Sequence, residues 1–212
     1  MKENITFNTQ DGIKIAATFY KASNPTGVAV ILLHMRARTR EDWQEFALKL
    51  NDAGFDVLAI DFRGHGESSG PRVEDFSDAD YQKLILDVKA SVNYLNTKNP
   101  NFKIAIAGAS IGANTALNYA VQNPNVAAVA LLSPGLNFKG VRTDGASKQI
   151  SPPVFLAVSS DDPQSFSGLE IWKRNIGHLE LVTFSDAGHG TNMFGPHPEL
   201  AEKIIDWLIG NI

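Results

Sequence analysis

Apolar residues fall into short uninterrupted runs along this chain, and most runs precede a segment with helical spacing. Six runs have the length of a β-strand: residues 28–33, 56–61, 103–107, 126–132, 154–158 and 179–184. Five segments have the spacing of an amphipathic helix: residues 41–53, 81–95, 111–121, 166–174 and 198–209. Strands that are apolar throughout are typical of a sheet covered by helices on both faces. The alternation therefore predicts an α/β fold with a mostly parallel, doubly wound sheet.

The N-terminal residues follow a different pattern. Residues 5–7 and 14–20 alternate as strands do, and Asp11-Gly12 between them is typical of a hairpin turn. We therefore expect an antiparallel hairpin at the edge of the parallel sheet. Because no repeat, low-complexity tract or linker interrupts the pattern, a single domain over residues 1–212 is the simplest prediction.

Composition and charge narrow the classes of function. Hydrophobic residues make up 43% of the 212 positions and charged residues 20%, as in ordinary globular proteins. The net charge of -4 argues against a general nucleic-acid binder, which needs clustered lysine and arginine, although a local patch can still bind an anion. The chain has no cysteine, so thiolate nucleophiles, disulfides and thiolate metal sites are excluded.

Targeting and cofactor signals are absent from the sequence. No apolar run is long enough to span a membrane or to form a signal core, which predicts a cytoplasmic protein without a membrane partner. A chain trimmed of a secretion leader would have the same sequence. There is neither a clustered ligand set nor a Gly-x-Gly-x-x-Gly turn, so we expect no metal and no organic cofactor.

The strongest candidate for chemistry is the segment Gly108-Ala109-Ser110-Ile111-Gly112, between a predicted strand and a predicted helix. In a nucleophile elbow the serine occupies a sharp, strained turn, and the residues two before and two after it must be small. Its hydroxyl then projects at a helix N-terminus, where backbone N–H groups favour negative charge. The bare pattern is weak evidence, but its strand-turn-helix context predicts that Ser110 is a catalytic nucleophile.

A serine nucleophile needs an imidazole to take its proton and a carboxylate to orient that imidazole. His189 follows the last predicted strand and lies between two glycines. Asp161 and Asp162 follow the preceding strand, so the candidates occur in the order serine, acid, histidine. Asp162 is favoured because it precedes a proline, and Asp161 stays open as the alternative acid. Asp186 is a weaker third candidate because it is too close in sequence to His189 to support it.

Two backbone N–H groups are needed to bind the oxyanion of a tetrahedral intermediate. One should belong to Ile111, the residue after the nucleophile. The other should come from the loop after residues 28–33, where Met35 is the expected donor.

At this point the chain resembles the α/β-hydrolase superfamily over nearly its whole length. The resemblance rests on His34, residues 61–68, the Ser110 elbow, the Asp162 loop and His189. Within the superfamily the chain looks like the small cap-less serine esterases and the dienelactone-hydrolase-like proteins, and the resemblance implies a structural role for residues 61–68. The chain departs from dienelactone hydrolases in having serine instead of cysteine as nucleophile. It also has Met35 where a glycine commonly follows the histidine.

Arg36, Arg38 and Arg40 lie in the same loop as Met35. One interpretation makes Arg36 and Arg38 a carboxylate- or phosphate-binding rim of the substrate pocket, and the other makes the loop a solvated surface. Only residues 133–153 lie where a cap domain would enter, and they have no helical pattern. We therefore expect no cap, and an open pocket bordered by this segment, the Arg36 loop and the loop at Met193-Phe194.

The sequence thus predicts a serine hydrolase, a carboxylesterase that acts on small or soluble esters through an acyl-enzyme on Ser110. The same triad would also serve a thioesterase, a lactonase or another acyl hydrolase. A protein of a different class, a catalytically silent binding protein on this fold, is the remaining alternative. The sequence leaves the oligomeric state open.

Overall fold

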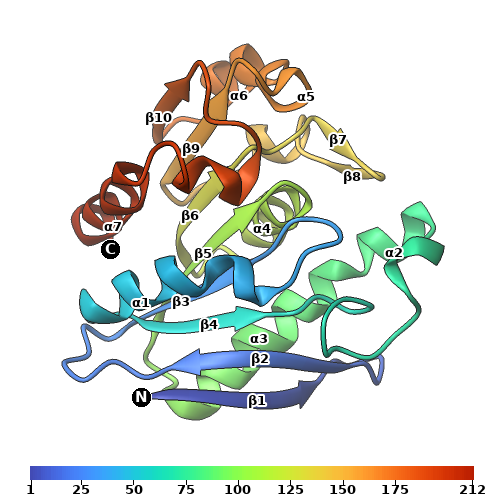
Figure 1. The fold of residues 1–212 in the computed structure, drawn as a ribbon, viewed down its shortest axis with the longest axis vertical. Helices are drawn as coiled ribbons and strands as arrows, with labels where there is room; N and C mark the ends of the chain where they lie inside the picture. The colour runs from blue at the N-terminus through green and yellow to red at the C-terminus, as the bar shows by residue number, and fades with distance from the viewer.

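The computed structural model describes residues 1–212 and has one large central sheet (Figure 1). Its eight strands lie in the order β1-β2-β4-β3-β5-β6-β9-β10. Their bounds are β1 Lys2–Asn8, β2 Lys14–Tyr20, β3 Val28–Leu33, β4 Asp56–Ile60, β5 Lys103–Ala109, β6 Val126–Leu132, β9 Val154–Ser159 and β10 Leu179–Phe184. The pairs β1–β2 and β2–β4 are antiparallel, and all other pairs are parallel. The mostly parallel sheet with an antiparallel N-terminal hairpin is confirmed.

Helices cover both faces of the sheet, as the apolar strands predict. The α-helices are α1 Gln44–Asp52, α2 Asp78–Gln82, α3 Leu84–Lys98, α4 Ile111–Gln122, α5 Pro163–Phe166, α6 Leu169–Asn175 and α7 Glu199–Asn211. Short 3₁₀ helices are η1 Arg40–Trp43, η2 Val73–Asp75, η3 Ala146–Lys148 and η4 Gly190–Phe194. None of these helices combines the length and the apolar character needed to cross a bilayer.

Alternate residues of each inner strand pack into two separate apolar layers. On β3, for example, Ile31 packs into the layer shared with α3 and α4, and Leu32 packs into the layer shared with α1 and α7. Because side chains alternate across a strand, every position of such a strand must be apolar. This doubly wound arrangement explains the uninterrupted runs in the sequence.

Two predicted helices are each divided in the structure. The segment at 81–95 is α2 followed by α3, and a capping box between Ser77 and Asp80 starts α2 ahead of the predicted boundary. The segment at 166–174 is α5 followed by α6, with Gly168 between them. A Cβ on Gly168 would lie 2.4 Å from the ring of Trp172, so only glycine allows the chain to fold over that tryptophan.

The segment between β6 and β9 contains no cap domain, as expected. It holds a small hairpin of β7 Asn137–Phe138 and β8 Val141–Arg142, followed by η3. The buried amide of Asn114 in α4 fixes this hairpin, because it donates to Gly135 O at 2.9 Å and to Val141 O at 2.7 Å and accepts from Gly135 N. The hairpin is therefore a fixed border of the sheet edge beside α4.

Candidate active site

The sequence-predicted residues follow the carboxyl ends of three parallel strands. Ser110 comes directly after β5, Asp161 and Asp162 come after β9, and His189 lies a few residues beyond β10. Carboxyl ends of parallel strands meet at one edge of a sheet, where sites in such folds are found. The structure thus brings these side chains to the same edge.

Ser110 stands on a strained turn between β5 and α4. Its backbone has φ 54° and ψ -119°, a conformation that side-chain-bearing residues rarely adopt, and its N–H donates to Leu132 O at 2.9 Å. A Cβ built on Gly108 would lie 2.4 Å from Gly112 O, and one on Gly112 would lie 2.3 Å from Leu33 O. Both glycines are therefore required by close backbone approach, which is the physical basis of the elbow pattern.

Of the three candidate acids, only Asp162 contacts the histidine. Its Oδ2 lies 2.6 Å from His189 Nδ1. Asp161 instead accepts hydrogen bonds from the Ser159 hydroxyl and from Gly188 N, and the bond from Ser159 lowers the pKa of Asp161. Asp186 is 78% exposed and pairs with His197 at 3.2 Å. The geometry therefore favours Asp162 as the partner of His189.

The loop that carries His189 is packed against the nucleophile elbow. Gly190 has φ 60°, and a Cβ on it would lie 3.3 Å from Ala109 Cβ, directly beside Ser110. Its N–H donates to Ser133 Oγ at 2.9 Å, and Ser159 Oγ accepts from Ala187 N at 2.9 Å. These two serines, which sequence reasoning missed, fix the loop. No hydrogen bond joins the Ser110 hydroxyl to His189 in this structure; in free enzymes such bonds are often long and tighten only with substrate.

The two predicted oxyanion donors have no competing partner. Ile111 is the first residue of α4, so its N–H has no acceptor within the helix, and the N–H of Met35 makes no hydrogen bond. His34 holds the loop beside this donor: its Nδ1 donates to the carbonyl oxygen of Met35 at 2.6 Å, and its Nε2 accepts from Phe62 N at 3.0 Å. Burial lowers the pKa of His34 to about 3, so the ring is neutral and can make both bonds.

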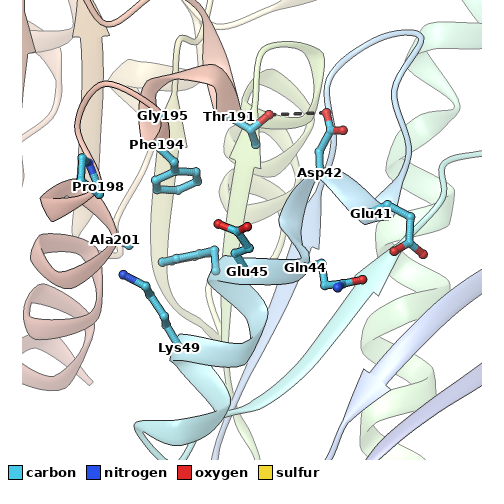
Figure 2. A pocket seen from close by; sticks show the side chains of 11 residues that line it. Glu41, Asp42, Gln44, Glu45, Lys49, Thr191, Phe194, Gly195, Pro198 and Ala201 are labelled. Atoms are coloured by element: carbon cyan, nitrogen blue, oxygen red, sulfur yellow. Dashed lines mark hydrogen bonds between the residues drawn. The ribbon is translucent and has the colours of Figure 1, made fainter.

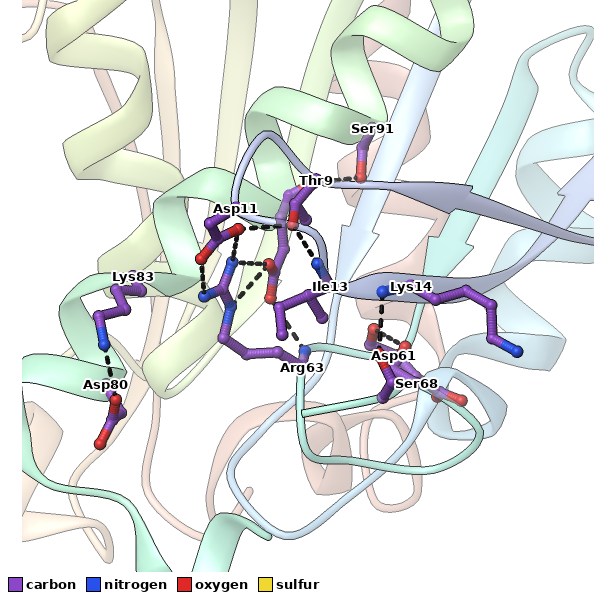
Figure 3. Close-up of polar contacts among 12 residues, drawn as sticks. Thr9, Asp11, Ile13, Lys14, Asp61, Arg63, Ser68, Asp80, Lys83 and Ser91 are labelled. Carbon is purple, nitrogen blue, oxygen red and sulfur yellow. Dashed lines mark hydrogen bonds and ion pairs between the residues drawn. The ribbon is translucent and has the colours of Figure 1, made fainter. Parts of the chain in front are cut away.

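Residues 61–68 form a buried polar network beneath this edge. The Asp61 carboxylate accepts from Arg40 N at 2.8 Å and Glu67 N at 2.9 Å and pairs with the Arg40 guanidinium. The Arg63 guanidinium reaches Asp11 at 2.7 Å (Figure 3). It also reaches Asp87 at 2.7 Å. Both guanidinium groups are buried and paired with carboxylates, so Arg40 and Arg63 bind neighbouring loops and not a ligand.

A cavity of about 390 Å³ opens beside Ser110. Its walls are Arg36, Tyr81, Ser110, Ile111, Asn137, Phe138, Lys139 and Gln164. Phe138 also packs edge-on against His189, with 6.1 Å between ring centroids, so the cavity and the histidine share one wall. Arg36 thus lies in the pocket, whereas Arg38 lies outside it and is 3.7 Å from Asp42.

The predicted border at Met193-Phe194 is wrong. Met193 is fully buried, and Phe194 stacks on Phe46 with 5.2 Å between ring centroids. Phe194 instead lines a second hollow of about 460 Å³ between α1 and the start of α7, together with Glu41, Asp42 and Glu45 (Figure 2). The other two predicted borders do line the cavity, Arg36 from its loop and Phe138 and Lys139 from the segment 133–153. No cluster of three or more histidine and carboxylate side chains is close enough together to hold a metal ion.

The sheet topology and the elbow define an α/β hydrolase. The sequence profile of the family described as "Serine aminopeptidase, S33" matches residues 24–159. The chain belongs to that family. The matched region includes the Arg36 loop and the Ser110 elbow and ends before Asp162 and His189.

The curated relatives with named activities include an esterase/perhydrolase and a lipase. The "Bifunctional esterase/perhydrolase" of Acinetobacter calcoaceticus is 34% identical over 148 residues, which cover 67% of this chain and 50% of that protein. The "Monoacylglycerol lipase" of Mycolicibacterium smegmatis is 30% identical over 138 residues, which cover 65% of this chain and 45% of that protein. The chain therefore spans about half the length of these relatives.

Among solved structures, an esterase of Pyrococcus furiosus is similar to this chain with a TM-score of 0.78. The match covers 98% of this chain and 90% of that one at 24% sequence identity. At this level of identity the likeness establishes the α/β-hydrolase fold alone.

Proposed function

We propose that the protein is a serine hydrolase that cleaves small or soluble carboxylic esters through an acyl-enzyme on Ser110. The observation that carries the proposal is the hydrogen bond from His189 Nδ1 to Asp162 at 2.6 Å, at the same sheet edge as a serine held at φ 54°. Strained backbone at a polar cavity is typical of a functional site. The names of the two relatives, an esterase/perhydrolase and a lipase, support ester chemistry.

In the first step, Ser110 Oγ attacks the ester carbonyl while His189 Nε2 takes the hydroxyl proton. Asp162 keeps the other imidazole proton on Nδ1 and stabilises the imidazolium. The N–H groups of Met35 and Ile111 bind the oxyanion. When the ester C–O bond breaks, the alcohol leaves with the proton that His189 carries.

In the second step, His189 takes a proton from a water molecule, and the resulting hydroxide attacks the acyl carbon. The bond between that carbon and Ser110 Oγ then breaks, and the proton returns to Ser110. The cavity of about 390 Å³ has no cap above it, which favours short or soluble acyl groups over long lipid chains.

The charges around Ser110 favour ester hydrolysis over aminopeptidase activity, which the family description would suggest. An aminopeptidase must accept a positively charged amino terminus next to the scissile bond. The cavity has two cations, Arg36 and Lys139, and no carboxylate among its walls. Such a site repels an ammonium group.

The proposal is tested by hydrolysis of p-nitrophenyl acetate, butyrate and octanoate by wild type and Ser110→Ala, with fluorophosphonate labelling in parallel. We expect labelling of the wild type only, faster turnover of the short esters, and a loss of at least about a thousandfold in kcat for Ser110→Ala. Near wild-type turnover by Ser110→Ala would refute the assignment. The absence of both turnover and labelling in the wild type would favour a silent binding protein, whereas labelling without turnover would favour a thioesterase or a lactonase.

A further inference from the structure

The cavity beside Ser110 is cationic in a protein whose net charge is -4. Two of its walls, Arg36 and Lys139, carry positive charge, and the remaining walls are neutral. The second hollow has the opposite character, with Glu41, Asp42 and Glu45 against one lysine (Figure 2). A local positive field in a protein of negative net charge favours an anionic ligand at this cavity.

Arg36 is held in place without being neutralised. Its Nε donates to the hydroxyl oxygen of Tyr81 at 2.6 Å, and it has no carboxylate within ion-pair distance. Its neighbours Arg38 and Arg40 do have carboxylate partners. Both terminal nitrogens of Arg36 are therefore free, and this pair of donors matches the two oxygens of a carboxylate.

Tyr81 adds an unused donor to the same wall. The residue is only 2% exposed, and its ring is fixed edge-on against Phe76 with 5.2 Å between centroids. Its oxygen accepts the bond from Arg36, but its own O–H has no acceptor in the structure. The hydroxyl also lines the cavity, so its O–H is available to donate to an acceptor oxygen of a ligand.

Lys139 lines the cavity in a strained backbone conformation. It occupies the tip of the β7–β8 hairpin at φ 50°, next to Gly140 at φ 80°. Hairpin turns with two successive positive φ angles favour asparagine or glycine, and a lysine at such a position is strained. Asn137 Oδ1 accepts from Gly140 N at 2.9 Å and stabilises the turn.

We propose that the substrate's acyl part ends in a carboxylate that Arg36, Tyr81 and Lys139 bind, so that the substrate is a monoester of a dicarboxylic acid. This inference rests on the proposed ester hydrolysis at Ser110. The cavity is lined by Ser110 and Ile111 but not by His189. The leaving alcohol departs beside His189, so the cavity holds the part that stays on Ser110. The bound carboxylate takes part in no bond change, and the product is a dicarboxylate.

The test compares kcat/KM for the mono-p-nitrophenyl ester of adipic acid with that for p-nitrophenyl hexanoate, which has the same chain length and no charge. We expect wild type to prefer the anionic ester by about tenfold, the effect of one charge-assisted hydrogen-bonded pair. Arg36→Gln should abolish most of this preference, and Lys139→Gln should reduce it by about threefold. Arg38→Gln is the matched control outside the cavity and should leave the ratio unchanged.

A second readout does not require turnover. Adipate should slow fluorophosphonate labelling of wild type and should protect Arg36→Gln much less at the same concentration. Inorganic phosphate serves as a separate competitor, and stronger protection by phosphate than by adipate would contradict the carboxylate assignment. Equal or greater kcat/KM for the neutral ester, or an unchanged ratio in Arg36→Gln, would overturn the inference while leaving the esterase proposal intact. Complete absence of labelling and turnover would overturn the esterase proposal itself.

Discussion

Two of the hollows on this molecule have similar volumes, about 390 Å³ beside Ser110 and about 460 Å³ beside α1. They differ most in the backbone conformation of the residues that build them. The four non-glycine residues with positive φ are Ala37, Ser110, Ser133 and Lys139, and all four belong to the segments that build the Ser110 site. No residue that lines the second hollow has a positive φ. Volume alone therefore does not identify the site, whereas strain that the fold maintains does.

The largest expected difference concerns the two adjacent aspartates of the Ser110 site. Asp162→Asn should lower kcat by about 10³- to 10⁴-fold, because an amide stabilises neither the correct tautomer nor the imidazolium of His189. Asp161→Asn should lower it by less than about tenfold, because Asp161 only holds the loop through Ser159 and Gly188. Steady-state hydrolysis of p-nitrophenyl butyrate measures both. Equal losses in the two variants would contradict the assignment of Asp162.

The next largest difference concerns glycine-to-alanine substitutions, because the backbone is closely packed at the Ser110 site and not at the second hollow. Gly112→Ala should lower the free energy of unfolding by about 3 kcal/mol or more, because its Cβ would lie 2.3 Å from Leu33 O and backbone must move. Gly195→Ala in the second hollow should change it by less than about 0.5 kcal/mol, because Gly195 has φ -66° and its nearest contact is 3.4 Å. Urea unfolding measures both variants, and a neutral Gly112→Ala would refute the packing argument.

The Ser110 site should also be the more acid-sensitive region, because it contains His34. Burial lowers the pKa of His34 from an ordinary 6.5 to about 3, so the unfolded chain binds a proton in this range that the folded chain does not. Stability is then lost as pH falls from about 6.5 toward 3, with a slope from this group of at most about 1.4 kcal/mol per pH unit. His34→Asn, which can keep a donor toward Met35 O, should flatten that part of the curve. An unchanged pH dependence of urea unfolding in His34→Asn would mean that His34 titrates normally.

The sequence predicts the sheet and the elbow because both depend on local pattern. Strands buried on two faces must be apolar at every position, and Gly108 and Gly112 are required within one turn of Ser110. Other features depend on contacts between distant segments. Tyr81 and Lys139 reach the cavity from a helix and a hairpin far from Ser110 in sequence, and Asn114 holds that hairpin in place. Asp161 and Asp162 are adjacent, and only their contacts with Ser159 and His189, which are distant in sequence from one another, show which of them faces the histidine.

The smallest expected effect comes from alanine-to-glycine substitutions in the two regions, which should change the free energy of unfolding in opposite directions. Ala37 has φ 56°, so Ala37→Gly relieves backbone strain and should raise the free energy of unfolding by about 0.5 kcal/mol after the entropy cost of glycine. Ala201 lies within α7 at the second hollow, so Ala201→Gly should lower it by about 1 kcal/mol. Urea midpoints at equal m-values resolve such changes. If Ala37→Gly destabilised the protein as Ala201→Gly does, the strain at this turn would contribute nothing to stability, and the contrast between the two hollows would rest on Ser110, Ser133 and Lys139 alone.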